Sequence, residues 1–80
     1  MRIDKFLKVS RLIKRRTVAN DACEAQKIFA NGKAVKPSYQ VKKGDILEIK
    51  FVNSSVKVRV TDISDNVKKG DASSLYEIVE

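Results

Sequence analysis

The chain has no histidine, a single cysteine and no long uncharged hydrophobic run. Without histidine, the commonest general base and the commonest metal ligand are both missing. One cysteine cannot form an internal disulfide or build a thiolate zinc site, and it fits a reducing compartment. The sequence therefore argues against an enzyme and predicts no metal site and no cofactor.

Patterns typical of other protein classes are also missing. Asp21, Glu24, Asp45 and Glu48 are scattered without a pairing motif, and there is no Gly-rich phosphate loop. The amino end carries charges every few residues, unlike a secretory signal, and no stretch approaches the length of a membrane span. We expect a protein of the cytoplasm with no membrane segment.

The length and composition predict one small binding domain. Eighty residues, 42% of them hydrophobic, suffice for a modest core, and we expect residues 1–80 to form a single domain. So short a chain has little room for both a core and an enclosed substrate pocket. A binding surface is easier to build.

Positive charge is concentrated at the amino end. Residues 1–16 hold seven basic side chains and one acid, a net charge of +6, out of +7 for the whole chain. The rest of the chain holds ten basic and nine acidic residues. Charge gathered in this way attracts a polyanion, which points to nucleic acid.

Two short helices are expected first. Ile3, Phe6 and Leu7 share one sector of a helix over residues 2–9, with Asp4 among the residues on the other side. A turn follows near residues 10–16. The second helix is expected to begin with Thr17 as its N-cap and to end near residues 25–26. Its expected core stripe is Val18, Ala22 and Ala25, and its water-facing residues are Asn20, Asp21 and Glu24.

Strands are expected in the remainder. Asn31-Gly32 between apolar flanks predicts a hairpin, closed by residues 36–38. Alternation predicts a strand through Leu47, Ile49 and Phe51 and another through residues 56–60, followed by a polar loop at 66–74 and a last strand at 75–79. The fold class is therefore α+β, with two short N-terminal helices packed on a small, mainly antiparallel sheet.

Four segments in this order resemble the S4 RNA-binding domain family. They are Arg2-Ile3-Asp4-Lys5-Phe6-Leu7, Lys14-Arg15-Arg16-Thr17-Val18-Ala19, Asn31-Gly32-Lys33 and Val41-Lys42-Lys43-Gly44-Asp45-Ile46. The opening residues 1–17 are more similar still to the RqcP branch, small stand-alone bacterial proteins related to the small heat-shock S4 protein. The resemblance implies an S4-like (αL) fold and no catalysis, because S4-containing enzymes carry their chemistry in a separate domain.

Resemblance to the RqcP branch implies an RNA-binding factor of ribosome-associated quality control. Its expected partners are large-subunit rRNA and peptidyl-tRNA on an obstructed large ribosomal subunit, where it would support tailing of the stalled nascent chain beside an RqcH-type partner. The free chain is expected to be a monomer. Two alternatives stay open: a general rRNA- or tRNA-binding S4 protein without a tailing role, and a basic protein-interaction module.

The expected RNA contacts are basic side chains, with Arg2 and Arg16 matching the signature arginines of the family. The full set is Arg2, Lys5, Lys8, Arg11, Lys14, Arg15, Arg16 and Lys33. Arg2 has an alternative role as a partner of Asp4, and one of the adjacent Arg15 and Arg16 is expected to brace the fold. Lys8 and Lys33 are equally compatible with plain solvated charge.

Three other positions carry expectations. Tyr39 and Tyr76 are more typical of core or edge residues than of base-stacking platforms, and Cys23 is typical of a small residue against the core. At the end of the second helix the family usually has glycine, whereas this chain has Gln26, which predicts strain or a different helix end.

Overall fold

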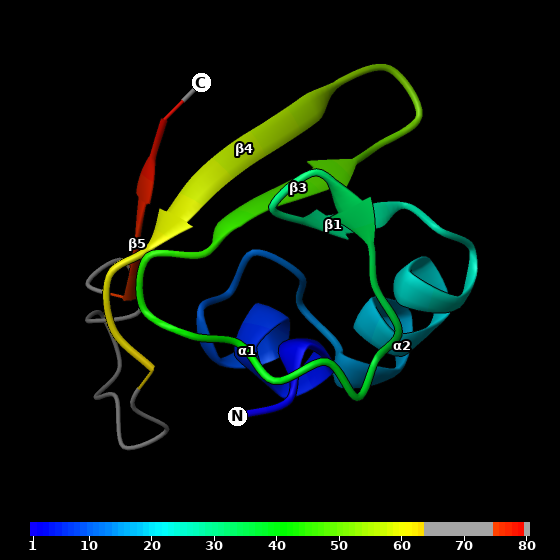
Figure 1. The fold of residues 1–80 in the computed structure, drawn as a ribbon. Coiled ribbons are helices and arrows are strands. Elements are labelled where there is room, and N and C mark those ends of the chain that lie inside the picture. Colours follow the sequence, from blue (N-terminus) through cyan, green and yellow to red (C-terminus); the bar gives the residue numbers. More distant parts are fainter. Residues whose placement is uncertain (64–74, 80) are drawn as a thin grey trace.

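The computed structural model describes residues 1–63 and 75–79, in which two helices cover one face of a five-stranded sheet (Figure 1). The helices are α1 (Ile3–Val9) and α2 (Arg16–Glu24), and the strands are β1 (Ile28–Ala30), β2 (Lys33–Ala34), β3 (Ile46–Lys50), β4 (Ser55–Val60) and β5 (Tyr76–Ile78). The α+β class is confirmed. The polar loop expected at 66–74 lies outside the described residues.

The sheet has the strand order β2-β1-β3-β4-β5, with every neighbouring pair antiparallel. Leu47 of β3 lies opposite Val58 of β4, and both are fully buried against the helices. The alternation expected for β3 and β4 is confirmed. Phe51 is an exception, because β3 ends one residue before it and its side chain is about half exposed.

The Asn-Gly pair forms the expected turn between β1 and β2. Asn31 and Gly32 both have positive φ, 52° and 86°, as a two-residue hairpin turn of the primed type requires. The side chain of Asn31 also reaches β3, where its Oδ1 accepts the backbone N–H of Ile46 at 3.0 Å. The hairpin is therefore tied to the centre of the sheet.

The core of α1 is as expected, because Ile3, Phe6 and Leu7 are fully buried. The expected exposure of Asp4 is wrong: this residue is only 3% exposed. Asp4 precedes Leu7 by three positions, so on a helix the two are neighbours and the carboxylate lies at the border of the apolar face.

The expected details of α2 are also wrong in part. The helix begins at Arg16, with Arg15 rather than Thr17 at the N-cap position. Its buried residues are Ala19 and Cys23, whereas Val18 is 50% exposed. Small residues four positions apart let α2 approach α1 closely, and this requirement overrides the greater hydrophobicity of valine. The expectation of Cys23 as a small core residue is confirmed.

The end of α2 explains the glutamine that departs from the family pattern. Gln26 has a φ of 59°, in the left-handed region that glycine adopts without penalty. Its N–H donates to the carbonyl of Cys23, and the N–H of Lys27 donates to that of Ala22. These two bonds form a Schellman motif, so the helix ends as it would with glycine, but Gln26 carries backbone strain.

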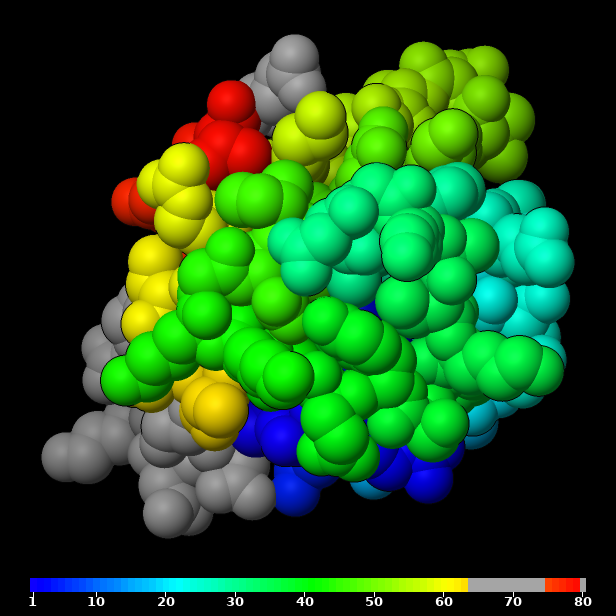
Figure 2. All heavy atoms as spheres, viewed as in Figure 1, coloured from blue at the N-terminus to red at the C-terminus, as the bar shows by residue number. Residues whose placement is uncertain are grey.

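The amino end is held by a later segment of the chain. The N–H of Ile3 donates to the carbonyl of Tyr39 at 2.7 Å, and the N–H of Val41 donates to that of Met1 at 2.9 Å. Figure 2 shows the first residues (blue) partly covered by this green segment. These two hydrogen bonds therefore fix the position of the start of α1 relative to this later segment.

Candidate nucleic-acid interface

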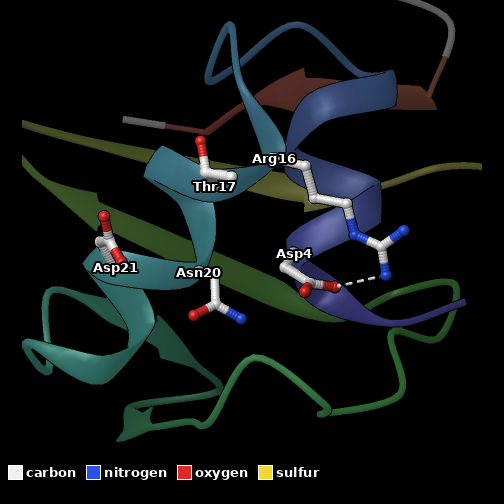
Figure 3. A pocket seen from close by; sticks show the side chains of 5 residues that line it. All are labelled: Asp4, Arg16, Thr17, Asn20 and Asp21. Atoms are coloured by element: carbon white, nitrogen blue, oxygen red, sulfur yellow. Dashed lines mark hydrogen bonds and ion pairs between the residues drawn. The ribbon is translucent and has the colours of Figure 1, made fainter.

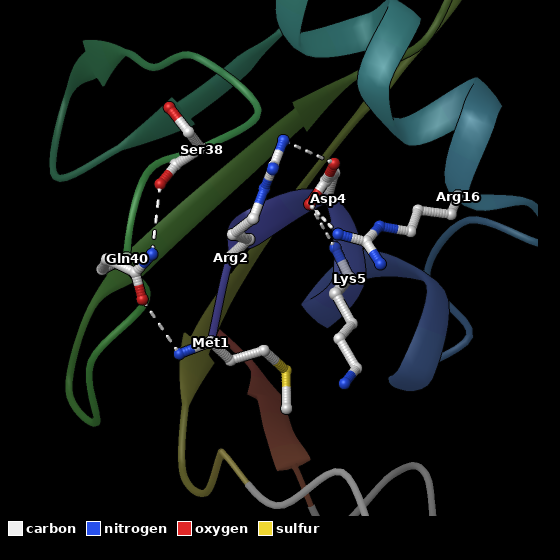
Figure 4. A network of polar contacts seen from close by, with 7 residues as sticks. All are labelled: Met1, Arg2, Asp4, Lys5, Arg16, Ser38 and Gln40. Carbon is white, nitrogen blue, oxygen red and sulfur yellow. Dashed lines mark hydrogen bonds and ion pairs between the residues drawn. The ribbon is translucent and has the colours of Figure 1, made fainter.

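The candidate site is built around the buried carboxylate of Asp4. Its Oδ2 lies 3.3 Å from Nη2 of Arg2, and its Oδ1 lies 3.4 Å from Nη2 of Arg16. Oδ1 also accepts the backbone N–H of Lys5 at 2.8 Å. In Figure 4 the two arginines approach Asp4 from opposite sides.

The surroundings keep Asp4 ionised. Burial alone would raise the pKa of its carboxyl, but hydrogen bonds from Arg16 and the Lys5 amide, together with the polar side chain of Asn20, outweigh burial and lower the pKa below its usual value. Figure 3 shows Asn20 on α2 with its side chain directed towards the side of the helix where Asp4 and Arg16 meet. Asn20, expected to face water, is thus a member of the site.

Each of the two arginines contacts Asp4 through its guanidinium and still has about half of its side chain exposed. The side chains of Arg2 and Arg16 are 46% and 47% exposed, although both touch a carboxylate that is 4% exposed. A guanidinium has five N–H donors, and each Nη2 contact to Asp4 leaves most of them unused by that contact. One carboxylate between two guanidiniums leaves a net charge of +1, so the group still attracts anions.

Two hollows flank this group. One, of about 400 Å³, is lined by Met1, Arg2, Lys5, Arg16, Gln40 and Ile63. The other, of about 300 Å³, is lined by Asp4, Arg16, Thr17, Asn20 and Asp21. Arg16 lines both hollows. In the first hollow Gln40 is oriented by the amino terminus, which donates to its Oε1 at 3.2 Å.

The structure brings together only some of the residues expected to contact RNA. Arg2, Lys5 and Arg16 share the larger hollow. Four others are further along the same segment: Lys8 is in the last turn of α1, Arg11 and Lys14 are in the connection, and Arg15 precedes α2, all four being exposed. Lys33 is exposed on β2 and lines neither hollow.

The open alternatives for the arginines now have structural answers. Arg2 does pair with Asp4, and of the adjacent Arg15 and Arg16 it is Arg16 that braces the fold. Because both paired arginines stay half exposed, bracing and RNA contact are compatible roles. Whether the eight basic residues touch RNA stays a prediction.

Sequence reasoning missed the central role of Asp4 and the contributions of Asn20 and Gln40. A signal for Asp4 was present, since it is the one acid among seven basic residues and borders the apolar face of its helix. No comparable signal marks Asn20 or Gln40. Their positions depend on how α2 and the segment before Val41 pack against α1.

Residues 1–63 and 75–79 contain neither a metal cluster nor a membrane-spanning helix. Within these residues, no three His, Cys, Asp or Glu side chains lie close enough together to hold a metal ion. No helix among them combines the length and the apolar character needed to cross a membrane.

Two helices against an antiparallel sheet, with paired arginines at the start of each helix, define a small basic nucleic-acid-binding domain of the S4 type. The S4 domain family model matches residues 1–47, and the chain belongs to this family. The resemblance to its RqcP branch is confirmed by curated relatives along nearly the whole chain. The S4 domain and the relatives of this branch are binding factors without catalysis of their own, and the chain is accordingly not an enzyme.

Three relatives illustrate the match. The chain is 51% identical to the RQC P-site tRNA stabilizing factor of Halalkalibacterium halodurans, over 98% of this chain and 89% of that protein. It is 47% identical to the factor of the same name from Streptococcus pneumoniae, over 99% and 90%. The trimeric structure of Vibrio cholerae heat shock protein 15 aligns with a TM-score of 0.90 at 29% identity, covering 99% of this chain and 81% of that one.

Proposed function

We propose that the chain is a single RNA-binding domain, residues 1–80, that binds large-subunit rRNA and peptidyl-tRNA on obstructed large ribosomal subunits. There it supports tailing of the stalled nascent chain. The observation that carries this proposal is the pair of half-exposed arginines held by buried Asp4 at the most basic part of the chain. The name shared by its relatives, RQC P-site tRNA stabilizing factor, supports tRNA as a partner and ribosome-associated quality control as the process.

The mechanism follows from charge and preorganisation. A phosphate oxygen entering the larger hollow meets Arg2 and Arg16 from two sides, while Lys5 adds a third cation. Binding releases condensed counterions and so depends steeply on salt. Because Asp4 already restrains both guanidiniums, less side-chain freedom is lost on binding than with free arginines.

The proposal includes a cellular setting. The protein acts in the cytoplasm, where ribosomes are found, and the free chain is a monomer that meets an RqcH-type partner on the obstructed particle. Sedimentation of the tagged protein from cells checks this setting. We expect it in large-subunit fractions that carry peptidyl-tRNA, and absence from those fractions contradicts the proposal.

The binding test compares alanine variants of two half-exposed, paired arginines, one at the candidate interface and one on the sheet. Arg16→Ala is expected to weaken binding to purified large subunits carrying peptidyl-tRNA by about tenfold. It should also reduce the slope of log affinity against log salt concentration by about one. Arg59→Ala is the matched control, because Arg59 is 50% exposed and paired with Glu77 on the sheet. Equal weakening by both variants would mean that net charge alone matters.

Two further outcomes separate the alternatives. If deletion of the gene leaves C-terminal tails on stalled chains unchanged while rRNA binding persists, the chain is a general rRNA or tRNA binder. If its partners are recovered undiminished after ribonuclease treatment and are lost on Arg16→Ala, the basic segment is a protein-interaction module. The tailing proposal requires shorter or missing tails in the deletion strain.

A further inference from the structure

An apolar groove lies where α2 meets the end of β3, away from the hollows around Asp4. It has a volume of about 370 Å³ and is lined by Leu12, Ile13, Lys14, Val18, Ala22, Lys27, Ile49, Lys50, Phe51 and Val52. None of these residues lines either of the two hollows that contain Arg16. In Figure 1, α2 and the β3–β4 turn are on the right of the view, whereas the N-terminus is at the bottom.

The groove exposes large apolar side chains to water. Val18, Phe51 and Val52 are 50%, 49% and 91% exposed, and they make up three of the five exposed large hydrophobic residues in the part of the chain that the structure describes. Scattered exposed hydrophobics are ordinary, but a contiguous set in a concave surface marks an interaction site. Two of the three, Val18 and Phe51, are residues whose sequence pattern predicts the core.

The charges around the groove are all of one sign. Lys14, Lys27 and Lys50 are among its lining residues, and none of the ten described lining residues is acidic. The Lys50 ammonium lies 4.7 Å from the centre of the Phe29 ring, on the face of the sheet away from the helices, so Lys14 and Lys27 are the charges that flank the groove on the side of α2. A partner that fits this surface presents apolar side chains flanked by carboxylates.

Two other occupants fit less well. RNA offers phosphates that can pair with the lysines but no aliphatic groups that can pack against the apolar residues of the groove. Phe51 is the single aromatic ring among the lining residues on which a base could stack. A second copy of the chain would bring the same lysines together, and like charges facing each other disfavour such a contact. The solved structure of Vibrio cholerae heat shock protein 15 is trimeric, which makes this second case worth testing.

We propose that this groove docks an acidic amphipathic segment of a partner protein. The segment places apolar side chains against Val18 and Phe51 and carboxylates beside Lys14 and Lys27. Helix-in-groove recognition of this kind uses anchors spaced at i, i+3, i+4 and i+7. Of the expected RNA contacts only Lys14 lines the groove, whereas Arg2 and Arg16 line the hollows around Asp4, so one molecule can hold RNA at the hollows and the protein segment at the groove.

The test uses a designed probe. A synthetic peptide of about four helical turns, with leucines along one face and glutamates beside them, is titrated into the full-length isotope-labelled protein and followed by NMR. We expect shifts concentrated at Val18, Ala22, Lys27, Phe51 and Val52. A scrambled peptide of the same composition should bind at least about tenfold more weakly.

Surface variants sharpen the test without disturbing the core. Val52→Asp and Lys27→Glu are expected to weaken peptide binding by about tenfold or more. Their matched controls, Val79→Asp and Lys36→Glu, make the same changes at residues that do not line the groove. Binding of Val52→Asp to large ribosomal subunits should equal that of the unaltered chain, which separates this proposal from the RNA-binding one.

Several outcomes overturn the proposal. It fails if the scrambled peptide binds equally well, if the shifts fall outside the groove, or if no shift appears at millimolar peptide. Self-association in sedimentation equilibrium that Val52→Asp abolishes would assign the groove to a second copy instead. An rRNA fragment that shifts the groove residues and loses affinity on Val52→Asp would assign it to RNA.

Discussion

Two buried carboxylates, Asp4 and Asp45, are satisfied by different kinds of groups. Asp45 is 7% exposed and accepts hydrogen bonds from the Tyr39 hydroxyl at 2.8 Å, the Asn31 side chain at 3.1 Å and the Lys42 backbone N–H at 3.0 Å. These donors are neutral and local to the loops that they join. Asp4 instead holds two cationic side chains that remain half exposed.

The electrostatics of the two sites are similar although their roles differ. Burial raises the pKa of Asp45, but the bonds from Lys42, Asn31 and Tyr39 outweigh burial and leave the pKa lowered, as for Asp4. Burial and the nearby Asp45 raise the pKa of Tyr39. A lowered pKa therefore does not identify a binding site. The two sites differ in what the partners of the carboxylate present to solvent: neutral loop groups at Asp45, and two half-exposed guanidiniums at the candidate interface around Asp4.

The largest effect is expected from Asp45→Ala. This change leaves Tyr39, Asn31 and the Lys42 amide without their shared acceptor, and we expect a loss of about 3 kcal/mol in the free energy of unfolding. Urea denaturation measures it. The folded fraction should bind large subunits with unchanged affinity, and weaker binding by folded protein would remove the contrast with Asp4.

Asp4→Asn tests whether Asp4 positions the arginines. The variant gains positive charge, so a model based on the field alone requires stronger RNA binding. We expect binding about tenfold weaker, equivalent to about 1.4 kcal/mol, because Arg2 and Arg16 lose their common anchor. A filter-binding titration at fixed salt gives the sign, and stronger binding would refute the positioning role.

Acid should weaken the fold through both carboxylates. Each folded-state pKa lies below the ordinary value of 3.8, so the stabilisation is complete above that value and is lost as pH falls through the lowered pKa. The loss is smaller than that caused by Asp45→Ala, because protonation leaves every side chain in place. Urea denaturation at successive pH values measures it, and Asp4→Asn or Asp45→Asn should each flatten the acid limb. Unchanged slopes would show that other groups control it.

Gln26→Gly is expected to have the smallest effect. Glycine relieves the left-handed backbone at the end of α2 and should raise the free energy of unfolding by about 0.5–1 kcal/mol. RNA affinity should stay the same, because Gln26 lines neither hollow beside Arg16. Thermal melting measures the gain. The variant also checks that a change of stability by itself does not alter binding.

Much of the fold followed from local patterns. The start of the sheet was predictable because Asn31 and Gly32 suit the left-handed turn that they occupy, and β3 and β4 because Leu47 and Val58 lie in alternating runs. The face that α2 buries was not predictable. Hydrophobicity favoured Val18, whereas close packing of the two helices selected the smaller Ala19.

The candidate site was predictable in its charge but not in its construction. The excess of positive charge in residues 1–16 identified the segment, and the adjacent pair Arg15-Arg16 indicated that one arginine would brace the fold. Which one braces, and against which carboxylate, depends on two helices meeting. Asp4 and Arg16 are twelve positions apart, beyond the reach of helical periodicity.

By itself, then, the sequence determined the class of fold, the turn of the hairpin and the segment that carries the charge, because these depend on neighbours along the chain. The tertiary structure alone decided that Asp4 is buried between two arginines and that Val18 and Phe51 are left at the surface. Both outcomes arise where separate elements pack together, and the space available there, rather than the character of any one residue, selects which side chains are enclosed.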